Sequence, residues 1–325
     1  MNSVFKRIVK SREFYLFIII LILIIFLGIK SEYFFKIENL RAMMLSLSVY
    51  GIIVSGLTIV FISGGFDMSV GSVLSTLGVL LGIFLVSGIS IALSIILTLS
   101  IGAVIGFSMG FLVAKAGLNP FITSISYYFA FYGLSFFIGY SSKLRTGQTL
   151  PQFSPFPETF NAIASGTIFG IEYIFFYMIA IVAIFHILST KNVFFRQNFY
   201  IGTNESAARV VGIRVDLVKI FNYTLVTIMV AVATILRASR VGGTNSGIAG
   251  PSFPLTMIAA IILGGGSLKG GTGSVLGSFF GVVIISILNN MMVLLGINPF
   301  YNTLIIGVVL LLSVMIDHLI KKRQL

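Results

Sequence analysis

Few side chains in this sequence are suited to acid–base, metal or nucleophilic chemistry. Its 325 residues include nine acids, two histidines and no cysteine. His186 stands alone in an apolar stretch, and His318 follows Asp317 near the C-terminus. Neither histidine belongs to an HExxH pattern or to another spacing that supplies metal ligands or a hydrolytic pair. We therefore predict no catalysis, no metal site and no cofactor on this chain.

One carboxylate lies within the apolar sequence. Asp67 is the only charged residue from position 42 to position 114, and it follows two glycines in SGGFDMSVGSVL (63–74). Gly64 and Gly65 predict a break in a helix, after which Asp67 would cap the next helix by accepting hydrogen bonds from its amides. The alternative is that the chain unwinds earlier, so that Asp67 reaches a polar cavity and is satisfied by a hydroxyl such as that of Ser69. The lack of a basic residue nearby in sequence favours the cap.

A glycine-rich stretch, GGGSLKGGTGSVLG (264–277), is superficially similar to a phosphate-binding loop. Such a loop needs the pattern GxxxxGK[ST], but here Lys269 is followed by glycine. We predict a tight turn that lets helices approach closely, and no nucleotide site. The glycines expected at helix breaks and turns along the chain are Gly64, Gly65, Gly71, Gly265, Gly266, Gly270 and Gly271.

A polar, alanine-rich segment, GTNESAARVVGI (202–213), predicts a short helix that Asn204 caps and Gly212 ends. Ala207, Ala208 and Val211 are expected on one side of it. A helix this short is marginal in water, so it needs support. Either it docks onto a partner, or it lies on lipid headgroups, held by arginines. The candidate docking residues are Asn204, Glu205, Ala207, Ala208, Arg209 and Gly212.

These motifs lie between apolar segments that predict an all-α integral membrane protein. The chain is 57% hydrophobic and 9% charged, whereas soluble domains carry about 25% charged residues. The net charge of +12 does not indicate nucleic-acid binding, because the bases form short clusters between apolar runs. We expect one transmembrane domain over residues 1–325, with about ten spans and one long loop at about 189–216. The predicted spans are Phe14–Ile29, Met43–Ile62, Val70–Ser87, Ile89–Ala114, Phe121–Tyr140, Ile171–Leu188, Leu217–Leu236, Gly247–Gly265, Ser274–Leu295 and Pro299–Ile320.

Two features refine this topology. Pro251 and Pro254 predict that the eighth span is kinked or partly unwound. With the N-terminus in the cytoplasm, roughly two thirds of the 21 lysines and arginines fall on the cytoplasmic side. We therefore predict that both termini and the loop 189–216 are cytoplasmic.

Three stretches resemble the permeases of ribose and monosaccharide ABC uptake systems. They are SGGFDMSVGSVL (63–74), YIGTNESAARVVGI (200–213) and IAAIILGGGSLKGGTGSVLG (258–277). The resemblance covers nearly the whole chain. One difference is that the family often has Glu-Leu-Asp before the third motif, where this chain has Pro254, Leu255 and Thr256.

The resemblance implies a sugar permease of the bacterial cytoplasmic membrane. Its expected partners are an ABC ATPase that holds ATP and Mg²⁺, a second permease copy or related chain, and an extracytoplasmic binding protein. In such permeases the short helix of the second motif seats in a cleft of the ATPase. The alternative is an ion-coupled transporter without an ATPase, for which Asp67 is the candidate carboxylate.

A permeating sugar would be bound by hydrogen-bonding side chains and aromatic faces. Polar residues inside the predicted spans are therefore candidates for the translocation path, although such residues also join helices to one another. The candidates are Asp67, Ser69, Asn119, Tyr128, Asn289 and Asn290.

Overall fold

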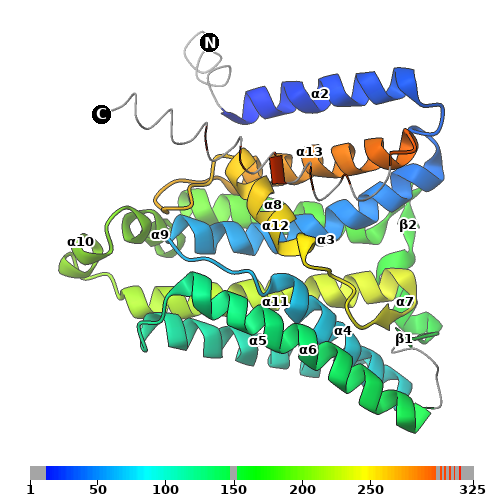
Figure 1. The fold of residues 1–325 in the computed structure, drawn as a ribbon, viewed down its shortest axis with the longest axis horizontal. Helices are drawn as coiled ribbons and strands as arrows, with labels where there is room; N and C mark the ends of the chain where they lie inside the picture. The colour runs from blue at the N-terminus through cyan, green and yellow to red at the C-terminus, as the bar shows by residue number, and fades with distance from the viewer. Residues whose placement is uncertain are drawn as a thin grey trace.

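The computed structural model describes residues 12–146 and 152–297, together with 301, 304, 307, 308, 311 and 315. In this part of the chain seven helices are long and apolar enough to cross a membrane, and they lie roughly parallel in one bundle (Figure 1). They are α2 (Arg12–Lys30), α3 (Ile37–Ile62), α5 (Ile91–Ala114), α6 (Pro120–Thr146), α8 (Tyr173–Lys191), α11 (Val215–Val241) and α13 (Val275–Leu294).

Two further apolar helices, α4 (Val70–Val86) and α12 (Ser252–Leu263), are too short to count as spans. An irregular stretch precedes each of them, so each forms only part of a crossing. The prediction that the region of Pro251 and Pro254 is partly unwound is confirmed, because α12 begins only at Ser252. Ten complete spans are not confirmed. The tenth predicted span, Pro299–Ile320, lies mostly outside the described residues.

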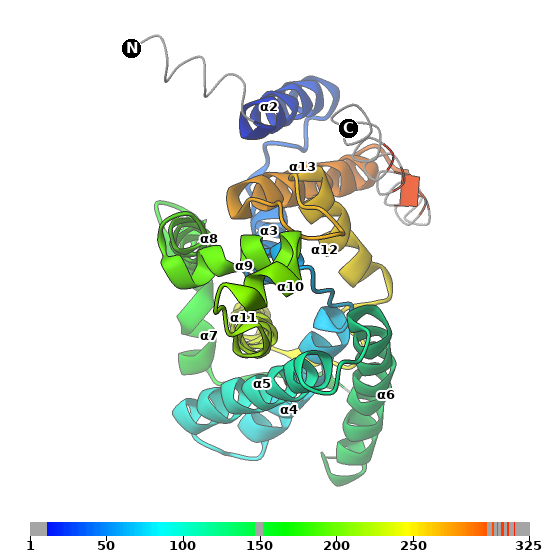
Figure 2. The same cartoon turned by 90° about the vertical axis from the view of Figure 1, so that its left-hand side faces the viewer.

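The bundle has two distinct ends. At one end lie the short helices α9 (Val193–Thr203) and α10 (Glu205–Val210), near the middle of the bundle when it is viewed from that side (Figure 2); we call this the α10 end. At the other end, the strand end, β1 (Gln152–Phe153) pairs antiparallel with β4 (Thr244–Asn245), and β2 (Thr167–Ile168) pairs with β3 (Ile171–Glu172). The helix α7 (Glu158–Ser165) also lies there.

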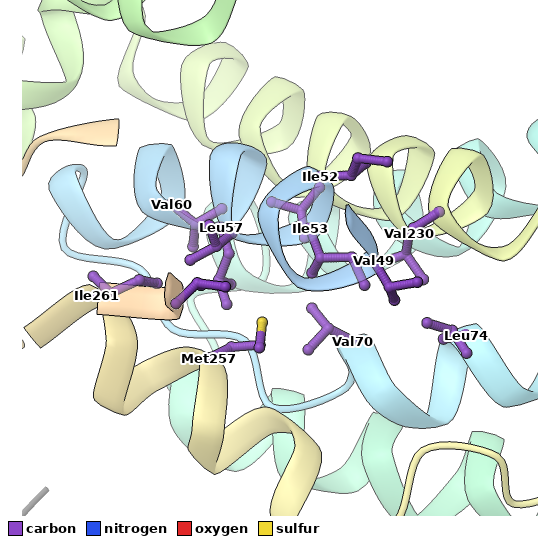
Figure 3. Packing of buried hydrophobic residues seen from close by; sticks show 14 of the residues in the cluster. Val49, Ile52, Ile53, Leu57, Val60, Val70, Leu74, Val230, Met257 and Ile261 are labelled. Carbon is purple, nitrogen blue, oxygen red and sulfur yellow. The ribbon is translucent and has the colours of Figure 1, made fainter. Parts of the chain in front are cut away.

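Helix α3 is the central element of the core. Its second half, from Leu47 to Ile62, is buried nearly all round, which is typical of a core helix, and Ile52, Ile53 and Leu57 are fully buried. Figure 3 shows these side chains beside residues of α4, α11 and α12, including Val70 and Met257. The outer helices expose apolar side chains instead, as expected of surfaces that face lipid.

Candidate coupling and translocation sites

The short helix predicted in the second motif is present as α10. The side chain of Asn204 accepts a hydrogen bond from the amide of Ala207 at 3.0 Å and so caps its first turn. Gly212 follows the helix with φ of +87°, a backbone conformation that favours glycine. Because cap and terminator are both local features, the sequence is sufficient to predict them.

The loop expected at 189–216 contains a second helix that the sequence did not predict. Helix α9 begins after Asn192, whose side chain accepts from the amide of Phe194 at 2.9 Å. Its buried residues are Phe195, Asn198 and Ile201, spaced three apart. That spacing was the available signal, but the polar residue in the middle obscured it. Asn198 accepts a buried hydrogen bond from Asn222 of α11 at 2.7 Å.

The alanines of α10 do not share one surface, contrary to the expected face of Ala207, Ala208 and Val211. Ala208 is only 2% exposed and packs against α9 and α11 of its own chain, in a cluster with Ile201, Val215 and Val218. Ala207 is exposed. Val210 and Val211 are 87% and 74% exposed. One side of the helix, that of Ala208, therefore packs against its own chain, whereas the side with Val210 and Val211 is exposed and partly apolar.

An ionic network holds α10 on the ends of α11 and α5. Glu205 accepts from Arg209 at 2.9 Å and from Lys219 at 2.5 Å. Arg209 also donates to Asp216 at 2.6 Å, and Asp216 pairs with Lys115 at 3.2 Å. Partial burial alone would raise the pKa of the Glu205 carboxyl, but the hydrogen bonds from Lys219 and Arg209 outweigh it and hold that pKa below its usual value.

Glycines join the three motif segments at the α10 end. The amide of Gly271 donates to the carbonyl of Ile62 at 2.9 Å. A Cβ at Gly202 would overlap both that carbonyl oxygen and the Gly271 nitrogen, and a Cβ at Gly270 would lie 2.7 Å from the Cα of Gly64. The end of α9, the end of α3 and the α12–α13 loop therefore touch through their backbones. The positive φ predicted for this loop is found at Gly265, Gly270 and Gly271.

Asp67 lies fully buried between α3 and α4. Its Oδ1 accepts from the amide and the hydroxyl of Ser69, each at 2.7 Å. Helix α4 begins after Ser69 without a side-chain cap, so Asp67 binds the residue before the helix and does not cap the helix amides as predicted; the hydroxyl of Ser69 is the partner named for the alternative. The Oδ2 of Asp67 has no partner among the described residues. The hydroxyl of Tyr223 binds the backbone of the preceding residue, Phe66, at 3.2 Å and fixes the irregular segment against α11. Gly65 and Gly71 pack closely against Tyr223 and α12 respectively.

Two of the other candidates for the translocation path belong to α6: Asn119 directly precedes it and Tyr128 lies within it. Asn119 is exposed at the α10 end, where its side chain accepts from the amide of Phe121 at 2.9 Å and caps α6. Tyr128 is buried, and its ring stacks on Tyr132 with centroids 5.6 Å apart. The hydroxyl of Tyr128 has no partner in the described part of the chain. Of the two, only Tyr128 retains an unused polar group inside the bundle.

Asn289 and Asn290 lie together on α13. They line a cavity of about 150 Å³ between α3 and α13, which Tyr50 also lines. Asn290 and Asn39 exchange hydrogen bonds of 2.6 and 3.2 Å through their side-chain amides, so this pair joins the two helices. Asn289 is left facing the cavity. The candidates thus do not converge on a single site.

Comparison with known proteins identifies the family. Residues 39–314 match the family described as the permease component of the branched-chain amino acid transport system. The chain belongs to this family of transport permeases. It is 34% identical to the ribose import permease protein RbsC of Bacillus subtilis (strain 168) over 93% of this chain and 91% of that protein. It is 30% identical to the galactose/methyl galactoside import permease protein MglC of Escherichia coli (strain K12) over 95% of each.

A third relative is named as a probable ABC transporter permease, y4mJ of Sinorhizobium fredii (strain NBRC 101917 / NGR234). It is 31% identical over 83% of this chain and 78% of that protein. No solved structure matches the chain. The permease is therefore a multi-pass membrane protein of the ABC importer class, and the predicted resemblance is confirmed.

Proposed function

We propose that this permease imports a monosaccharide or a similar small polyol that an extracytoplasmic binding protein delivers, and that an ABC ATPase drives it by gripping α10. The sugar class follows from relatives named for ribose and galactose import at 30–34% identity. ATP and Mg²⁺ would bind to the separate ATPase. A second copy of the permease, or a related chain, would complete the path.

The coupling role is supported by the difference between the two sides of α10, one packed against the chain and the other exposed. Its inner side is fixed by Ala208 and by the ion pairs of Glu205 and Arg209. Its outer side leaves Val210 and Val211 without a covering group. Exposed apolar pairs on a rigid element are typical of a protein contact.

A partner that moves α10 would move the rest of the bundle through two connections. The ionic network leads to α5 and α11, and Gly202 leads to α3 and the α12–α13 loop. Interfaces that pack in two alternative arrangements can convert such a displacement into an inward or outward opening. Family membership favours this mechanism over an ion-coupled transporter.

The coupling proposal places the α10 end in the cytoplasm and the strand end outside the cell, in the bacterial cytoplasmic membrane. The predicted excess of basic residues on the cytoplasmic side supports this orientation. The strand end would then receive the binding protein.

Substitution of both exposed valines tests the coupling. We expect Val210→Asp with Val211→Asp to leave the permease folded but to abolish co-purification with its ATPase and sugar uptake in proteoliposomes. Phe169→Asp is the matched control, because Phe169 is fully exposed at the strand end; it should keep ATPase association. Unchanged association of the double variant would contradict a docking role for α10.

A further inference from the structure

The cavity between α3 and α13 has a largely polar lining although it lies within the bundle. Its walls are two helices that run side by side (Figure 1, Figure 2). Polar side chains within spans either join helices to one another or bind a ligand, so the partners of each group decide its role. Seven residues, none of them charged, line its volume of about 150 Å³: Ala42, Met43, Ser46, Tyr50, Ser286, Asn289 and Asn290.

The cavity lies in the half of the bundle nearer to the strand end. Helix α3 begins at that end, because its last residue, Ile62, accepts a hydrogen bond from Gly271 at the α10 end. The lining residues of α3 extend from Ala42 to Tyr50, about 8 to 20 Å from the start of the helix at 1.5 Å per residue. Ala42 and Ser46 are exposed, so the cavity is open on their side. It is therefore nearer to the side on which the proposed function places the binding protein.

Two of the polar lining residues have partners within the protein. Asn290 exchanges hydrogen bonds of 2.6 and 3.2 Å with Asn39, which also donates to the carbonyl of Phe34 at 2.9 Å. Ser46 donates to the carbonyl of Ala42, one turn earlier in its own helix, at 3.3 Å. The asparagine pair joins α3 to α13 beside the cavity. The walls are thus held in place before a ligand arrives, which reduces the cost of binding.

The other three polar lining residues keep a hydrogen-bonding group free. Ser286 is only 4% exposed, and its hydroxyl has no partner among the described residues. The amide of Asn289 and the hydroxyl of Tyr50 also form no hydrogen bond in that part of the chain. The ring of Tyr50 is positioned by Phe253, which it meets edge-on with centroids 5.1 Å apart. Polar groups left unpaired inside a protein are costly, so these three indicate a polar occupant.

The lining fits a neutral, hydroxylated molecule. All three free groups can both donate and accept hydrogen bonds, as a sugar hydroxyl does. A divalent cation would need carboxylate oxygens and an anion would favour arginine or lysine, but no lining residue is charged. An apolar molecule would leave the free groups unpaired. An apolar cavity of about 150 Å³ holds benzene, so this cavity has room for one ring of similar size.

We propose that this cavity is a sugar-binding subsite in the outer half of the translocation path, where Asn289, Ser286 and Tyr50 bind hydroxyl groups of one neutral monosaccharide. The ring of Tyr50 and the side chain of Met43 contact the apolar face of the sugar. This rests on the proposed function as a sugar importer, and it specifies an uncharged substrate together with the residues that bind it.

Protection of a single thiol in the cavity tests this assignment. The chain has no cysteine, so Ala42→Cys gives one thiol in the lining. The permease–ATPase complex is placed in lipid nanodiscs, and the rate of modification by a small water-soluble thiol reagent is measured with ribose, galactose or xylitol as probe. We expect a transported probe to slow modification. At twice its dissociation constant the effect should be about threefold, because only empty cavities react.

Two variants in the Ala42→Cys background identify the binding groups. Ser286→Ala and Asn289→Ala should each raise the probe concentration that gives half-protection about fivefold, the effect of one lost hydrogen bond. Neither residue has a hydrogen-bond partner to lose among the described residues, so the unfolding midpoint should not fall. Ser278→Ala is the matched control, because Ser278 is also a buried serine of α13 without a partner in the described part of the chain, yet it does not line the cavity. It should leave half-protection unchanged.

Uptake of the same probes is measured in proteoliposomes that also contain the binding protein. The inference is overturned if a probe that is taken up gives no protection, in which case the cavity holds water only. It is also overturned if the thiol is not modified at all, or if Ser286→Ala and Asn289→Ala both behave like Ser278→Ala. In these cases sugar import itself still stands. If the importer takes up none of the three probes, the proposed function fails instead.

Discussion

At the scale of single residues, Gly202 carries the sharpest steric constraint. Its φ is not in the left-handed region, so what requires glycine is the close backbone approach of Ile62 and Gly271. We expect Gly202→Ala to separate α9 from the end of α3 and to destabilise the permease by about 2 to 3 kcal/mol, because backbone atoms cannot turn aside as a side chain does. A lower thermal unfolding midpoint of the purified complex would measure this.

The matched control for Gly202 is Gly133 on α6, where an added Cβ would meet nothing within 4 Å. Gly133→Ala should be neutral or slightly stabilising, by up to about 1 kcal/mol, since alanine favours the helix. Equal unfolding midpoints for the two variants would show that the glycine contact at the α10 end is not under steric constraint.

At the scale of elements, α10 has six residues and depends on its surroundings for order. The pKa of Glu205 is held below its usual value, which is about 4.3. Its ion pairs are therefore complete above that pH, and their contribution is lost as pH falls through the lower value. The chain has no tryptophan, so Val211→Trp provides a single reporter. Its fluorescence anisotropy should stay high at neutral pH and decrease only in acid, below the usual pKa of a glutamate, because the pKa of Glu205 is lowered.

Removal of the carboxylate should have the same effect without acid. In the Val211→Trp background, Glu205→Gln is expected to give low anisotropy at all pH values. Glu38→Gln is the control, since Glu38 is an exposed glutamate at the opposite end of the bundle. If the Glu205→Gln protein retained the high anisotropy of its parent at pH 7, the ionic network would not be what orders α10.

The sequence was informative about elements with local signals. Asn204 and Gly212 predicted the ends of α10, and Pro251 predicted the break before α12, because caps, terminators and prolines act on adjacent backbone. The direction of Ala208 was not predictable in this way. It depends on how Val215 and Val218 of α11 pack beneath α10, a contact between elements that no spacing within the motif encodes. Helix α9 was not predicted for the same reason: its polar Asn198 is buried because it accepts a hydrogen bond from Asn222 of another helix, and the segment alone resembles a polar loop.

At the scale of the whole molecule, orientation in the membrane decides whether the α10 end can meet a cytoplasmic ATPase. The chain has no cysteine, so single cysteines report their side without background. Ala116 lies in the exposed turn between α5 and α6, next to Lys115, which pairs with Asp216 at the α10 end. Phe169 lies at the strand end.

In intact cells, a maleimide that cannot cross the membrane should label Phe169→Cys but not Ala116→Cys, and after permeabilisation it should label both. The physical reason is that roughly two thirds of the basic residues would otherwise have to cross the membrane during insertion. The reverse pattern would place α10 outside the cell, where no ATP is available to drive it. Labelling of both positions in intact cells would instead show that the two ends lie on the same side, which the antiparallel run of α5, α6 and α8 forbids.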